Sequence, residues 1–104
     1  MFRSTIILLG ILLVGPSLSL AVESPSLDLG KSLFEASELG TKQRNCNTCH
    51  PQGKGLDQVG DFNDDELKDI INACIRDALG GEMLATNSQE MNALLGYVRM
   101  FQKE

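Results

Sequence analysis

Two cysteines and a histidine stand close together in the middle of the chain, in the order Cys46-Asn47-Thr48-Cys49-His50. Two thiols separated by two residues and followed directly by histidine form the attachment signature of c-type haem. The spacing lets the thiols reach the two vinyl groups at one porphyrin edge, and it sets the imidazole beneath the iron as proximal ligand. We therefore expect one covalent haem c bonded to Cys46 and Cys49, with His50 bound to its iron.

A CxxC pair also occurs in structural disulfides, in redox-active dithiol sites and in zinc sites. Zinc would need further cysteine or histidine ligands at matching spacing, and His50 is the only histidine of the sequence. A thioredoxin-like dithiol would need a βαβ setting, whereas the sequence shows no alternating strand pattern. Haem is therefore the favoured interpretation. The ring nitrogen of His50 that faces away from iron is then expected to bond to a backbone carbonyl in the following loop.

The second axial position of the iron has two candidate ligands, Cys74 and Met83. Met83 lies in a loop just before the last predicted helix, where many single-haem cytochromes carry a distal methionine. Met91 and Met100 fall at apolar positions of that helix and are expected to be core residues. Cys74 is the unpaired third cysteine. It is either a small buried hydrophobe or a thiol close enough to ferric iron to lose its proton and bind.

The first 21 residues have the features of a secretory signal peptide. A positive n-region, an apolar stretch and a small-x-small cleavage pattern follow one another in Arg3, residues 6–14 and Ser19-Leu20-Ala21. The apolar stretch is short for a bilayer span, so a retained membrane anchor is the weaker interpretation. We expect residues 1–21 to be removed and residues 22–104 to be exported to the periplasm or an equivalent extracytoplasmic compartment.

The composition indicates a small acidic domain that needs a cross-link or a bound cofactor for stability. Removal of 21 of the 104 residues leaves 83, with no tryptophan, and aromatic residues are 5% of the whole chain. Such domains bury a limited core, which a porphyrin would extend with a large flat apolar surface. Loss of Arg3 changes the formal net charge from −5 to −6. This charge argues against nucleic acid as a partner and fits a redox protein with a basic surface.

Apolar periodicity predicts three helices and no strands. The first helix is expected from a cap near Asp28 to Gly40. The last is expected to open at Asn87, because Glu90 three residues later completes a capping-box signature. Residues 51–61 contain three glycines and no sustained period, which predicts an irregular loop.

The second predicted helix has the clearest pattern. Asn63 and Glu66 form a capping-box signature at its start, and Gly80-Gly81 supplies the stop. One apolar stripe runs along it through Leu67, Ile70, Ile71, Cys74, Ile75, Ala78 and Leu79. Cys74 stands at the middle of this stripe, which is expected to face the haem.

The terminal helices resemble the crossed helices of class I cytochromes c, through Gly30 and Phe34 in the first and Gly96 and Tyr97 in the last. With the CxxCH segment, this resemblance implies an all-α, class I cytochrome c-like fold. It would comprise three main helices around one covalently bound haem, in a cytochrome c domain of residues 22–104.

The second half of the chain is similar to a narrower group of cytochromes. The similar segments are Ile71-Asn72-Ala73-Cys74-Ile75, Gly80-Gly81-Glu82-Met83-Leu84, Ser88-Gln89-Glu90-Met91-Asn92-Ala93-Leu94 and Tyr97-Val98. They resemble haem domains of thiosulfate dehydrogenases and SoxA-type sulfur-oxidation cytochromes. In length the chain is similar to small NaxLS-type cytochromes, which pair as heterodimers. The resemblance implies His50 and Cys74 as the axial pair. Unlike the sulfur-oxidising enzymes, this sequence has one CxxCH motif and no visible second domain.

A thiolate ligand donates charge to iron and favours its ferric state, so His/Cys ligation predicts a low reduction potential. The favoured function is electron transfer or redox sensing without catalysis, because no spare catalytic constellation stands out. One alternative is the binding of CO or NO after Cys74 leaves the iron. Others are a haem subunit of a sulfur-oxidising enzyme and an ordinary His/Met electron carrier. The expected partners are redox proteins, including another small c-type cytochrome in a heterodimer.

Overall fold

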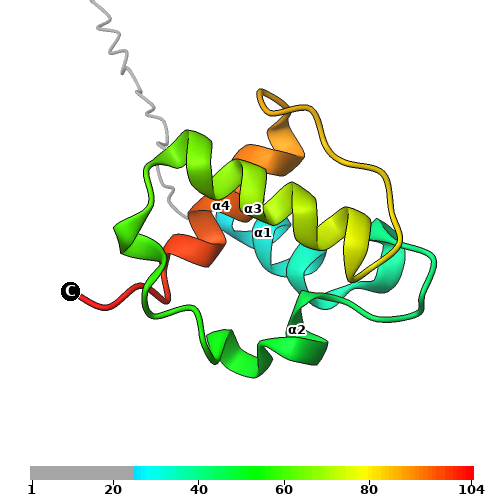
Figure 1. Ribbon diagram of the computed structural model, residues 1–104, viewed down its shortest axis with the longest axis horizontal. Helices are drawn as coiled ribbons and strands as arrows, with labels where there is room; N and C mark the ends of the chain where they lie inside the picture. The colour runs from blue at the N-terminus through cyan, green and yellow to red at the C-terminus, as the bar shows by residue number, and fades with distance from the viewer. Residues whose placement is uncertain (1–24) are drawn as a thin grey trace, which may run out of the picture.

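The computed structural model describes residues 25–104, which form four α-helices and no strand (Figure 1). The helices are α1 (Pro25–Glu35), α2 (Cys46–Cys49), α3 (Asp64–Asp77) and α4 (Gln89–Arg99). The all-α prediction is confirmed for this part of the chain, and none of its helices is long and apolar enough to cross a membrane. The predicted signal peptide, residues 1–21, lies outside the described residues.

Single turns of 3-10 helix interrupt the connections. They are η1 (Ser37–Leu39), η2 (Pro51–Gly53) and η3 (Val59–Asp61). The expected irregular loop contains η2 and η3. The first helix was predicted too long at its C-terminus, because Ala36 is extended and separates α1 from η1. After η1 the chain passes the residues that follow the end of α3. There the Thr41 N–H donates to the Leu79 carbonyl at 2.9 Å.

Helix α3 begins as predicted. The Asn63 side chain accepts from the Glu66 N–H at 2.9 Å, and the Glu66 carboxylate accepts from the Asn63 N–H at 2.9 Å. At the other end Gly80 adopts a left-handed conformation with φ +70°, which favours glycine. The next N–H, of Gly81, donates to the Ile75 carbonyl at 2.9 Å. Local chemistry thus fixes both ends of α3.

Helix α4 begins one residue later than predicted. Ser88 is its N-cap, and the Ser88 hydroxyl accepts from the Met91 N–H at 3.1 Å. Asn87 lies instead in the preceding turn, which the Ser88 N–H closes onto the Ala85 carbonyl. The buried residues of this helix are Met91, Ala93, Leu94, Leu95 and Val98. One side of the last helix therefore packs into the core, with Met91 buried as predicted.

Helices α1 and α4 cross at Gly30 and make the most extensive helix contact of the described residues. A Cβ atom at Gly30 would overlap the Ala93 carbonyl oxygen and lie 2.7 Å from the Tyr97 Cβ. Beside the crossing, the ring centroids of Phe34 and Tyr97 are 5.2 Å apart. Gly96, which also carries the resemblance to crossed terminal helices, has no neighbour within 4 Å of its Cβ position. The Ala93 carbonyl and the Tyr97 Cβ, rather than Gly96, face Gly30.

The crossing can be tested with one substitution made on each helix. Gly30→Ala should lower the free energy of unfolding by about 1–3 kcal/mol, because the added methyl forces the helices apart. Gly96→Ala should raise it by up to about 1 kcal/mol, because that site is open and alanine favours the helix. Urea unfolding followed by circular dichroism measures both values. Equal effects of the two substitutions would contradict the crossing.

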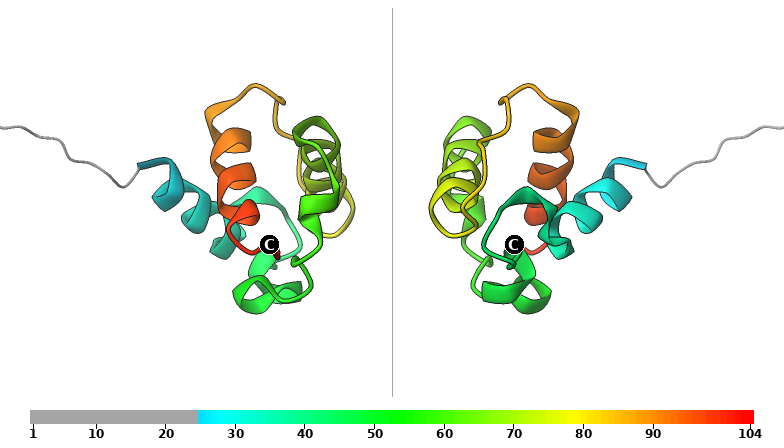
Figure 2. Two further views of the ribbon diagram at one scale, coloured as in Figure 1. Left: turned by 90° about the vertical axis from the view of Figure 1, so that its left-hand side faces the viewer. Right: turned by 90° about the vertical axis from the view of Figure 1, so that its right-hand side faces the viewer.

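Helix α4 lies between α1 and α3, and the segment from α2 to η3 lies below all three (Figure 2). Arg99 at the end of α4 fastens this lower segment. Its guanidinium donates to the carbonyls of Val59 and Phe62, at 3.1 and 2.8 Å, and to the Asp64 carboxylate at 2.8 Å. These bonds hold η3 and the start of α3 against α4.

Candidate functional site

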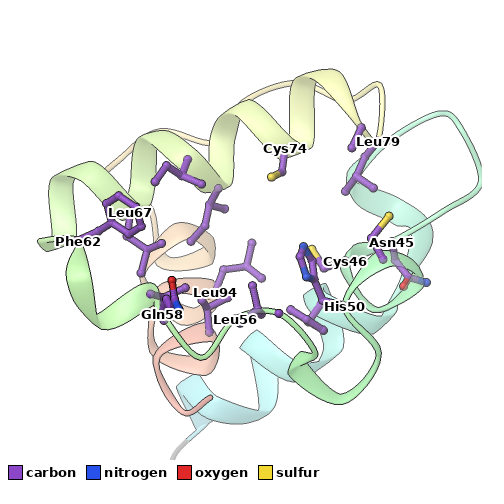
Figure 3. Close-up of a pocket in the computed structure, with 18 residues that line it drawn as sticks. Asn45, Cys46, His50, Leu56, Gln58, Phe62, Leu67, Cys74, Leu79 and Leu94 are labelled. Atoms are coloured by element: carbon purple, nitrogen blue, oxygen red, sulfur yellow. The ribbon is translucent and has the colours of Figure 1, made fainter. Parts of the chain in front are cut away.

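A cavity of about 450 Å³ occupies the space between α3 and the lower segment (Figure 3). Its wall is mostly apolar and includes Phe34, Leu56, Val59, Phe62, Leu67, Ile70, Ile71, Ala78, Leu79, Leu94 and Val98. The four predicted site residues also line it, namely Cys46, Cys49, His50 and Cys74. Ligand and cofactor sites have volumes of about 300–1,000 Å³ and apolar walls with few polar groups, and this cavity matches both features.

The two cysteines of the CxxCH segment form the ends of the short helix α2, which is capped by Asn45. The Asn45 side chain accepts from the Thr48 N–H at 3.0 Å, and the Thr48 hydroxyl accepts from the Asn45 N–H at 3.0 Å. The Asn45 amide also donates to the Glu35 carbonyl at the end of α1, at 2.8 Å. Asn45 therefore anchors the thiol-bearing helix to α1. This role was not predicted from the sequence, although Asn-x-x-Thr is a recognisable cap pattern.

His50 has a fixed ring orientation. Its Nδ1 lies 2.8 Å from the Lys54 carbonyl oxygen. A carbonyl only accepts, so Nδ1 donates this bond, and in the neutral ring the lone pair lies on Nε2. The loop reaches back to the ring through left-handed residues, among them Gly53 and Gly55 with φ +80° and +85°. Figure 3 shows the imidazole directed into the cavity, and a backbone acceptor lies in the following loop as expected.

Cys74 projects from α3 into the cavity, on the wall opposite His50 (Figure 3). It is exposed, so the alternative of a small buried core residue is wrong. The apolar stripe of α3 is divided, because Leu67 and Ile71 are buried while Ile70 and Cys74 remain accessible. The C-terminal end of α3 is held against the connection between η1 and α2, since the Lys42 ammonium donates to the Asp77 carbonyl at 3.1 Å.

Two thiols of this cavity, those of Cys46 and Cys74, favour their protonated forms. Although Cys74 is an exposed residue, the cavity wall partly desolvates its thiol, which raises the pKa of Cys74, and the neighbouring Cys49 and Asp77 raise it further. Burial, with repulsion from Cys74, raises the pKa of Cys46 to about 11. The protein alone therefore opposes a thiolate at Cys74, so a nearby metal cation would have to supply the stabilisation.

No methionine of residues 25–104 lines the cavity. Met83 is 54% exposed and lines a separate depression formed with the outer face of α3 and residues 84–86. Met91 is buried in the core, as expected, whereas Met100 is exposed and not part of it. Cys74 is therefore the only candidate distal ligand that shares the cavity with His50.

The arrangement fits a flat group better than a single metal ion. In the described part of the chain, no three histidine, cysteine or acidic side chains gather as a metal ion would need. Instead, Cys46 and Cys49, at the two ends of α2, both line the cavity, with His50 and Cys74 on facing walls. Two cysteines of one short helix and ligand residues on two facing walls match the attachment and axial ligation of haem c.

Comparison with known proteins adds no relative: no protein-family model, curated protein or solved structure matches this chain. The resemblance to class I cytochromes c therefore remains a prediction. The cavity and its residues carry the functional argument.

Proposed function

We propose that this chain is a single-haem c-type cytochrome of class I-like fold that transfers electrons or senses redox state. Haem c would be bonded to Cys46 and Cys49, with His50 and Cys74 as axial ligands. The observation that carries the proposal is the pairing of His50 and Cys74 across one apolar cavity that Cys46 and Cys49 also line.

When bound, haem c supplies reversible one-electron exchange at its iron. The Lys54 carbonyl holds the His50 imidazole in one orientation, with Nε2 free to bind. With haem in place, the apolar wall would exclude water and lower the local dielectric constant. The electrostatic attraction between the iron and a Cys74 thiolate would therefore be stronger. Because a thiolate donates charge, these residues favour ferric iron and a low reduction potential.

Electron transfer is favoured over substrate turnover by the chemistry of the wall. Thiosulfate is an anion, and no lysine or arginine of the described residues lines the cavity. A sulfur-oxidising enzyme would need such a group for its substrate. Binding of CO or NO in place of Cys74 stays a prediction, tested by adding CO to the reduced protein.

The opening of the cavity suits a docked partner. Phe62 and Ile70, both on the wall, are 40% and 39% exposed. The adjoining sequence is acidic, with exposed carboxylates at Asp61, Asp65 and Asp69. Apolar contact with an acidic surround fits a redox protein with a basic surface, including another small c-type cytochrome in a heterodimer. We also propose export, which supplies the compartment in which c-type haem is attached.

Mass spectrometry of the processed protein from its native host tests the proposal. After denaturation, the intact chain should retain the mass of one haem, because thioether bonds survive unfolding. The N-terminus of the same sample should be Val22. A colourless chain of bare polypeptide mass, folded and stable, would contradict the proposed function.

A further inference from the structure

Asn72 is the one polar side chain among residues 25–104 that is buried, at 6% exposure. Both polar atoms of its side-chain amide form hydrogen bonds with the backbone of one residue, Leu84. The Asn72 Nδ2 donates to the Leu84 carbonyl at 2.9 Å, and its Oδ1 accepts from the Leu84 N–H at 2.8 Å. A buried amide with both groups satisfied fixes its partner's position closely, since breaking either bond leaves a buried polar group unpaired.

The bonded residue belongs to the loop between α3 and α4, and the bonds lie on the outer face of α3. Asn72 and Cys74 are two residues apart, which is about 200° around a helix, so they point to opposite sides. One turn earlier, Lys68 donates to the Thr86 carbonyl at 2.8 Å. Figure 1 shows the loop passing on the side of α3 away from α2. The neighbour of Leu84 is Met83, which is thereby held outside the cavity.

We propose that Asn72 is a positioning residue that decides which sulfur atom reaches the iron. By fastening the loop to the outer face of α3, it withholds the Met83 thioether and leaves the distal position to Cys74. This inference rests on the proposed haem site and adds a determinant of its ligand set.

The loop has few other restraints over this stretch. Its first part is fixed, because the Gly81 backbone lies directly against the Leu39 carbonyl and leaves no room for a Cβ atom. Its last part is fixed by the Ser88 cap of α4. Between these ends the hydrogen bonds to α3 come from Asn72 and the half-buried Lys68. Release of Leu84 would therefore free the segment that carries a flexible, neutral iron ligand.

The test compares ferric and ferrous absorption and EPR spectra of three variants. Cys74→Ala alone should be high-spin, because Met83 stays on the outer face. Cys74→Ala with Asn72→Ala should become low-spin with a methionine–iron charge-transfer band. Adding Met83→Leu to that pair should restore the high-spin spectrum. The inference is overturned if Cys74→Ala alone already shows methionine ligation that Met83→Leu removes, or if the double variant stays high-spin.

Two further measurements guard against a simple folding defect. Asn72→Asp keeps the size and the acceptor but replaces the donor with a carboxylate facing the Leu84 carbonyl, so it should act like Asn72→Ala. Hydrogen exchange of the Leu84 amide should be faster by about tenfold or more in both Asn72→Ala and Asn72→Asp. Asn92→Ala, at an exposed asparagine of α4, is the matched control and should change neither readout. Unchanged Leu84 exchange in both Asn72 variants would also refute the inference.

Failure of the proposed function looks different. A wild-type chain that lacks covalent haem removes the haem site itself. A wild-type chain that carries haem with Cys74 ligation, but whose ligand set ignores Asn72, removes this inference alone.

Discussion

Replacement of Cys74 by alanine is expected to convert the ferric iron from low-spin to high-spin and to raise its reduction potential. Cys74 is the candidate distal ligand on the cavity wall opposite His50, and alanine offers no ligand atom. The potential should rise by on the order of 0.1 V or more, since axial ligands tune haem potentials over about 0.8 V. EPR of the ferric protein and a potentiometric titration measure the two effects. Covalent attachment should be unaffected.

Two controls separate the ligand from its surroundings. Ile70→Ala removes a neighbouring side chain from the same helix face and the same cavity wall, and it should leave the iron low-spin. Met83→Leu alters the competing ligand on the outer face of α3 and should also leave the spectrum unchanged. An unchanged spectrum in Cys74→Ala together with a changed one in Met83→Leu would assign the distal position to Met83.

Replacement of both Cys46 and Cys49 by serine is expected to abolish covalent haem and most of the folded structure. Both residues line the central cavity of about 450 Å³. At about 24 cal/mol per Å³, an unfilled cavity of that volume costs at most on the order of 10 kcal/mol. This is comparable to the whole stability of a domain, about 5–15 kcal/mol. Circular dichroism and the mass of the denatured chain should both report the loss.

Cys74→Ser is the matched control, because it makes the same substitution on the opposite wall of the same cavity. It should keep the haem mass, since Cys74 is outside the CxxCH segment. Single replacement of Cys46 or Cys49 should leave one thioether and a less stable holoprotein. A colourless double-serine variant with the helicity and unfolding midpoint of the wild type would show that the cavity needs no occupant.

The sequence was sufficient to predict the parts of the fold that depend on local chemistry. The ends of α3 follow from an asparagine–glutamate cap and a glycine stop, each complete within a few residues. The start of α4 was predicted less well because Asn87 and Ser88 are both good caps. The choice depends on the turn that the Ser88 N–H closes onto Ala85. The end of α1 depends on the contact of residues 40–42 with α3, which no local pattern reveals.

The candidate site also has parts that the sequence predicts and parts that it does not. Periodicity was sufficient to predict that Cys74 shares a helix face with the apolar stripe, and the structure shows this face at the cavity. The position of Met83 could not be predicted, because its loop has no period and its course depends on the buried Asn72 amide. The residues that make the helix crossing could not be predicted, because a helix sequence does not reveal its angle to a distant partner. Gly30, Ala93 and Tyr97 make that contact.

The crossing of α1 and α4 has a consequence for the order of events during synthesis. It joins the first and last helices of the described chain, so a ribosome must complete α4 before this largest contact can form. Cys46 and Cys49 are made well before α4. The nascent polypeptide therefore carries its two thiols before the terminal helices can close on each other.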